Sequence, residues 1–190
     1  MRLFFALPLP PGAKERLRPI LEAARRAGGD GVTFTKLEQL HFTLAFLGEQ
    51  PDAKEAVSAG EVLREGRAFE LAISGVGAFP NTLRPRVLWL GVSAGAPELM
   101  ETAERLRAEL RRRGFQIEDR RFQPHLTIGR VRPRGEKLAK QALAAVAPGE
   151  FARWRAGEVN LVRSVLGRGG ATHTLERAFP FAPAGAPGER

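Results

Sequence analysis

Two of the three histidines in this 190-residue chain stand in the same short pattern. His41 lies in the stretch LHFTLAF and His125 lies in PHLTIGR, so each is followed two positions later by a threonine, Thr43 or Thr127. Residues i and i+2 of a strand point to the same face, so each histidine shares a polar face with its threonine, and the apolar residues between them face a core. Imidazole exchanges protons near neutral pH, and a hydroxyl can stabilise charge on a phosphate oxygen. The pattern predicts acid–base chemistry at phosphorus.

Two other interpretations of these histidines remain open. Histidines often bind metals, but His41 and His125 have no third histidine or carboxylate at a metal-binding spacing, so we expect no metal site. Each histidine could also be a satisfied core or edge residue, although this explains one motif more easily than two. The chain has no cysteine, which excludes disulfides, thiolate metal ligands and cysteine nucleophiles.

The charge of the chain favours a polyanionic partner. Lys and Arg together number 30 against 21 Asp and Glu, a formal net charge of +9. The arginine excess suits bidentate phosphate recognition, although it also fits a heat-adapted or GC-rich genome. The apolar runs are far shorter than the roughly 20 residues of a membrane-spanning helix, so we expect a cytoplasmic protein with no membrane contact.

The order of expected elements repeats within the chain. The first half is expected to contain, in order, a strand at 1–9, a helix at 12–29, strands at 32–36 and 41–48, a helix at 51–66 and a strand at 69–79. The second half is expected to contain a strand at 86–92, a helix at 97–114, a strand at 122–131, a helix at 135–147 and a strand at 151–165. This repeat predicts two duplicated lobes related by a pseudo-twofold axis. We expect a single bilobal domain over 1–181, with an N-lobe of about 1–80, a C-lobe of about 85–165 and a final strand returning at 171–181. The segment 182–190 is expected to be a flexible tail.

Several segments together resemble one family. The segments are RLFFALPLP, LHFTLAFLGE, GVGAFPNTLRPRVLWLGV, FQPHLTIGRV and VNLVRSVLGRGGATHTLERAFPF. In order and spacing they are similar to the bacterial and archaeal RNA 2′,3′-cyclic phosphodiesterases, also called 2′-5′ RNA ligases. These belong to the two-histidine (2H) phosphoesterases. The resemblance implies a bilobal α+β fold with two antiparallel β-sheets around a central cleft and helices on the outside. Two positions depart from the pattern: His173 stands where many relatives have Tyr, and Phe34 where they often have Trp.

The resemblance also implies an activity. It is the metal-independent, cofactor-free opening of an RNA-terminal 2′,3′-cyclic phosphate to a 2′-phosphomonoester. Carried over by position, His41 and His125 are the catalytic residues, with His125 as general base on water and His41 as general acid to O3′. Thr43 and Thr127 would bind the phosphate.

Arg130 is the third expected substrate-binding residue. It lies five positions after His125, so it reaches the same face only if the strand bends near Gly129.

We expect the partner to be RNA with a 2′,3′-cyclic phosphate end, such as a tRNA half or a nucleotide, and the protein to be a monomer. Reverse 2′-5′ ligation is a secondary activity, because water normally outcompetes an unoriented ribose hydroxyl. Two alternatives stay open: a non-catalytic module that binds RNA ends or nucleotides, and a 2H phosphodiesterase that acts on another cyclic or 3′-terminal phosphodiester.

Overall fold

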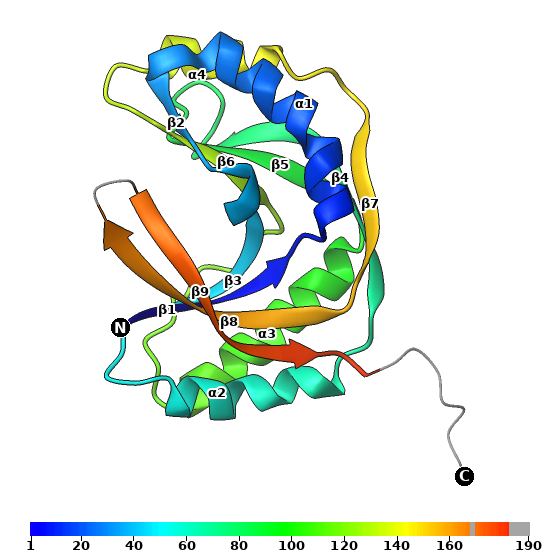
Figure 1. The fold of residues 1–190 in the computed structure, drawn as a ribbon, viewed down its shortest axis with the longest axis vertical. Helices are drawn as coiled ribbons and strands as arrows, with labels where there is room; N and C mark the ends of the chain where they lie inside the picture. Colours follow the sequence, from blue (N-terminus) through cyan, green and yellow to red (C-terminus); the bar gives the residue numbers. More distant parts are fainter. Residues whose placement is uncertain (168–169, 183–190) are drawn as a thin grey trace.

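The computed structural model of the protein describes residues 1–167 and 170–182 and contains two antiparallel β-sheets (Figure 1). The four-stranded sheet has the order β3-β1-β8-β9, and the five-stranded sheet has the order β2-β6-β5-β4-β7. The strands are β1 (Arg2–Pro8), β2 (Val32–Phe34), β3 (His41–Glu49), β4 (Phe69–Phe79), β5 (Val87–Ala94), β6 (Leu126–Val131), β7 (Glu150–Ala156), β8 (Glu158–Gly167) and β9 (Gly170–Pro180). The expected α+β class with two antiparallel sheets is confirmed.

The helices lie on the outer sides of the two sheets. They are α1 (Pro11–Gly28), α2 (Lys54–Gly60), α3 (Ala96–Arg112) and α4 (Glu136–Ala144), with short 3-10 turns such as η2 (Leu37–Gln39). In Figure 1, α1 and α4 lie above the five-stranded sheet, α2 lies at the bottom below the four-stranded sheet, and α3 runs upward past β8. Within the described residues, no helix has both the length and the apolar character that crossing a membrane requires.

The sheets share one plan but do not follow the two halves of the chain. The order β3-β1-β8-β9 corresponds to β6-β5-β4-β7, with β2 added beside β6. However, β4 from the first half pairs with β5, and β8 from the second half pairs with β1. The helices also cross over, because α1 packs against β7 and α3 packs against β3. Interleaved segments therefore build each sheet, in place of the expected lobes of about 1–80 and about 85–165. The connection over residues 80–86 keeps β4 beside β5.

Two strands replace the single strand expected over 151–165. β7 ends at Ala156 in the five-stranded sheet, and β8 begins at Glu158 in the four-stranded sheet. Both segments have strand-like composition, and Gly157 between them is a local sign of the break. β9 agrees with the expected final strand to within one residue at each end. Of the tail expected over 182–190, only Ala182 is described, and its N–H donates to Gly66 O at 2.9 Å; 183–190 lie outside the described residues.

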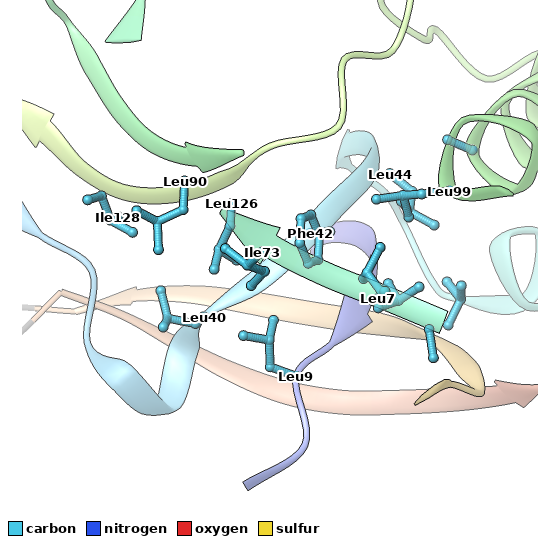
Figure 2. Packing of buried hydrophobic residues seen from close by; sticks show 14 of the residues in the cluster. Leu7, Leu9, Leu40, Phe42, Leu44, Ile73, Leu90, Leu99, Leu126 and Ile128 are labelled. Atoms are coloured by element: carbon cyan, nitrogen blue, oxygen red, sulfur yellow. The ribbon is translucent and has the colours of Figure 1, made fainter. Parts of the chain in front are cut away.

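The apolar partners of the two histidine motifs form part of the core that joins the sheets. Phe42 and Leu126 are fully buried, and Figure 2 shows them among neighbouring buried side chains that include Ile73. The Phe42 ring lies 6.3 Å from that of Trp154 in β7, so the core spans both sheets. Each such side chain contributes roughly 1.5–3 kcal/mol when fully buried. The strands that carry the histidines are therefore anchored from behind by shared hydrophobic packing.

Candidate active site

The two histidines are held in the same way. His41 stands at the first residue of β3, and His125 directly precedes β6. The His41 Nδ1 atom lies 2.7 Å from the carbonyl oxygen of Gln39, and the His125 Nδ1 atom lies 2.6 Å from that of Gln123. Because a carbonyl only accepts hydrogen bonds, Nδ1 carries the donated proton in both rings. Nε2 is therefore the nitrogen that can exchange a proton, which is the state that acid–base catalysis needs.

The residues two positions before each histidine were missed in the sequence. The pattern is longer than His-x-Thr, since Gln39 and Gln123 extend it to Gln-x-His-x-Thr in both copies. It is their backbone carbonyl that orients each imidazole, and Gln39 Nε2 also donates to the carbonyl of Ala171 in β9. The glutamine shared by the two copies was the available signal for this contact. However, the contact is made by the backbone carbonyl, which any residue type could supply, so the sequence pattern does not predict it.

A β-bulge follows each threonine at the same place. In β6, Trp89 pairs with Thr127 and the preceding residue of β5, Leu88, pairs with Gly129, so Ile128 is the extra residue. In a regular strand, Arg130 and Thr127 would point to opposite faces because they are three residues apart. The extra residue in the bulge reverses this and puts Arg130 on the face of Thr127. The bend expected near Gly129 is therefore present as a bulge.

The corresponding bulge in β3 has a different consequence. Ala6 pairs with Thr43 and Phe5 pairs with Ala45, which leaves Leu44 as the extra residue. Phe46 then shares the face of His41 and Thr43, and it occupies the position that Arg130 holds in β6. Phe46 is 56% exposed. One copy thus presents a cation and the other an aromatic ring beyond the threonine.

A cavity of about 430 Å³ is lined by residues of both sheets. Thr43 and Phe46 of β3 reach it from the four-stranded sheet, and His125, Thr127 and Arg130 reach it from the five-stranded sheet. We call it the His125 cavity. Four of the five expected site residues therefore line one cavity.

His41 lines a second cavity, of about 320 Å³, together with Phe4, Lys14, Gln39 and His173. We call it the His41 cavity. The five expected site residues thus line two cavities. Since His41 and Thr43 share one face of β3, the two cavities lie on the same face of that strand.

Aromatic rings support both imidazoles. The His41 ring has its centroid 4.9 Å from that of Phe4 and 5.5 Å from that of His173. The His125 ring meets Phe79 edge to face at 4.8 Å. His173, at the departure from the family pattern, therefore packs directly on a histidine motif.

Burial keeps both histidines neutral in the free protein. It lowers the pKa of His41 from 6.5 to about 4, with smaller lowering from the charges of His173 and Lys14, while the Gln39 carbonyl opposes the shift. Burial also lowers the pKa of His125, and the Gln123 carbonyl again opposes it. A bound anion would favour the protonated form of either ring.

A buried arginine that the sequence reading missed holds the segment before His125. Arg107 of α3 is only 5% exposed, and its Nη2 donates to the carbonyls of Glu118 and Arg120. Glu104, one turn earlier, accepts a hydrogen bond from the backbone N–H of Phe122 at 3.2 Å. One face of α3 therefore clamps the 118–122 segment. The available signal was its spacing, since Arg107 stands four residues after Ala103 and three before Leu110, beside the buried apolar stripe of the helix.

Arg120 and Arg121 also line the His125 cavity, together with Arg130. The cavity wall is therefore basic, as an anionic ligand requires. In the described part of the chain, no three His, Cys, Asp or Glu side chains gather closely enough to hold a metal ion.

Comparison with known proteins identifies the family. The family model described as the 2′-5′ RNA ligase superfamily matches residues 9–168. The chain belongs to this superfamily, and the resemblance found in its motifs is confirmed.

Several relatives carry the name RNA 2′,3′-cyclic phosphodiesterase. The chain is 34% identical to the protein of that name from Archaeoglobus fulgidus over 94% of this chain and 99% of the relative. It is 36% identical to that from Methanothermobacter thermautotrophicus over 94% and 98%. It is 32% identical to that from Escherichia coli over 91% and 92%.

Two solved structures are similar in fold. TT0787 of Thermus thermophilus has a TM-score of 0.78 at 30% identity and covers 95% of this chain and 97% of its own. E. coli LigT complexed with 3′-AMP has a TM-score of 0.73 at 26% identity, with the same coverage of 95% and 97%.

Proposed function

We propose that the protein hydrolyses the 2′,3′-cyclic phosphate at an RNA end to a 2′-phosphomonoester, without a metal ion, by acid–base catalysis from His41 and His125. Family membership and the curated relatives named RNA 2′,3′-cyclic phosphodiesterase support this activity. The observation that carries the mechanism is the matched pair of imidazoles. Each donates Nδ1–H to a carbonyl two residues back and leaves Nε2 for proton exchange.

The reaction is an in-line displacement at phosphorus. Water attacks on the side opposite O3′, His125 Nε2 takes its proton, and the new P–O bond forms as the P–O3′ bond breaks. His41 Nε2 gives its proton to the departing O3′, while the P–O2′ bond remains, so the product is a 2′-phosphate. Thr43 and Thr127 donate hydrogen bonds to the non-bridging oxygens, and Arg130 adds positive charge beside them.

The bound phosphate helps to charge the general acid. In the free protein His41 is neutral at pH 7, because its pKa is about 4. A phosphodiester carries one negative charge, which favours the imidazolium form of a ring beside it and raises that pKa. Substrate binding thereby assembles the protonation state that the reaction needs.

Reverse ligation would use the same groups. A ribose hydroxyl of a second RNA replaces water, loses its proton to His125 and forms a 2′-5′ linkage as O3′ leaves. We propose it as a secondary activity, because water at about 55 M competes with any hydroxyl that is not held in place.

Turnover of adenosine 2′,3′-cyclic phosphate in EDTA tests the proposal. We expect adenosine 2′-monophosphate as product, with the rate unchanged by the chelator. Either His41→Ala or His125→Ala should reduce kcat by about 10²–10⁴-fold, with unchanged circular dichroism and melting. Binding without turnover by the native protein would identify a non-catalytic module. Full activity in either variant would overturn the two-histidine assignment.

A further inference from the structure

The His41 cavity contains cationic groups that the proposed hydrolysis does not use. Lys14, near the beginning of α1, and His173, in β9, both line it beside His41. They come from opposite ends of the described chain, and the pairings of β1 with β3 and β8, and of β8 with β9, bring them near His41. A cavity next to the reaction centre thus carries two positive or potentially positive side chains.

Among the described residues that line the cavity, one carboxylate offsets these groups only in part. Burial lowers the pKa of Lys14 and of His173. Lys14 Nζ donates to the backbone carbonyl of Glu38 at 2.7 Å, which holds the ammonium at the cavity wall. That carboxylate is the exposed Glu38; its charge raises the pKa of Lys14, but burial lowers it by more. An anion inside the cavity would therefore satisfy Lys14, His173 and His41 together.

The stereochemistry of the proposed reaction, on which this inference depends, determines which anion can reach there. If His41 protonates O3′, the ribose that carries O3′ lies on the His41 side of the phosphorus, opposite the attacking water. The C5′ substituent of that ribose leads away from the cyclic phosphate, beyond His41. In an RNA end this substituent is the next phosphate of the backbone.

We propose that the His41 cavity is a subsite for the 5′-phosphate of the terminal nucleotide, with Lys14 and His173 as its cationic contacts. The preferred substrate class is then an RNA end or a 5′-phosphorylated nucleoside 2′,3′-cyclic phosphate. A nucleoside 2′,3′-cyclic phosphate with a free 5′-hydroxyl leaves the subsite empty. Charge-assisted hydrogen bonds to phosphate are among the strongest polar contacts, so the preference should be large enough to measure.

The experiment compares kcat/KM for adenosine 2′,3′-cyclic phosphate with that for its 5′-phosphorylated form. The native protein should prefer the 5′-phosphorylated substrate by about tenfold or more. Lys14→Ala should bring the ratio of the two values close to one, while Lys14→Arg, which keeps the charge, should retain most of it. Lys54→Ala removes the same charge at the exposed start of α2 and should leave the ratio as in the native protein. Equal kcat/KM for the two substrates in the native protein, or an undiminished ratio in Lys14→Ala, would overturn the subsite.

A binding measurement separates this proposal from the activity itself. Calorimetry with adenosine 2′-monophosphate and adenosine 2′,5′-bisphosphate requires no turnover and no variant. The bisphosphate should bind the native protein about tenfold more tightly at equal ionic strength. Tighter binding in a protein that hydrolyses neither cyclic substrate would support the subsite and reject the proposed function. Equal affinities in a protein that hydrolyses the cyclic substrates would support the proposed function and reject the subsite.

Discussion

The rings of His41 and His173 lie edge to face with their centroids 5.5 Å apart. The two residues come from β3 and β9, the two edge strands of the four-stranded sheet, and the Phe4 ring contacts both, 4.9 Å from His41 and 5.1 Å from His173. The protonation of one imidazole is therefore coupled to that of the other, because two positive charges at this distance repel.

Replacing His173 by Phe should raise the pKa of His41. The substitution removes a charge that lowers this pKa but keeps an aromatic ring over His41, so the value should rise above about 4 and stay below 6.5. NMR titration of the His41 ring proton gives the measurement, with the His125 signal as internal reference. A His41 titration that does not move would show that burial alone sets this pKa.

The activity should have an acidic pH dependence. His125 must be neutral and His41 protonated, and in the free protein the pKa of His41 is about 4 and that of His125 is below 6.5. Both pKa values lie below 6.5, so the proton that the reaction needs is lost as the pH rises, and kcat/KM should fall as the pH rises above 6.5. The alkaline limb of kcat should lie at higher pH, because bound phosphate raises both pKa values. Rate profiles from stopped assays at constant ionic strength test this, and a kcat/KM that keeps rising above neutral pH would contradict it.

Thr43 and Thr127 should contribute through their hydroxyls. Valine has the same shape but no donor, so Thr43→Val or Thr127→Val should lower kcat about ten- to a hundredfold with little change in melting. Serine at either position keeps the hydroxyl and should restore most of the loss. If valine and serine variants are equally active, the threonines only fill space.

Arg107→Met should destabilise the protein and disturb the segment before His125. The substitution leaves the Arg120 carbonyl without its donor, at a cost of about 1–3 kcal/mol for an unsatisfied group, while the Glu118 carbonyl keeps a hydrogen bond from Arg111 Nη2 at 3.1 Å. Urea unfolding measures the loss, and hydrogen exchange of 118–122 should quicken. The control is Arg105→Met, which removes an ion pair with Glu101 on the surface of the same helix and should change stability little. Equal effects of the two substitutions would show that the clamp is not special.

The sequence by itself determined the parts of this protein that depend on local pattern. The alternation around His41 and His125 predicted a buried Phe42 and Leu126 and a partly open histidine and threonine on each strand, because side chains of a strand alternate in any fold. The family and the α+β class followed from motifs spread along most of the chain.

Only the tertiary structure decided what depends on pairing between distant segments. Periodicity predicts a strand but not the strand it pairs with. It therefore did not reveal that β4 pairs with β5 of the second half or that β7 and β8 lie in different sheets. The bulge at Ile128, which turns Arg130 to the site, is a property of register with β5. The contact of His173 with His41 and the division into two cavities likewise arise from packing between strands and helices that are remote in sequence. Which of these segments pack together depends on their contacts in the folded protein, because local conformational preference does not specify the partner of a strand or helix.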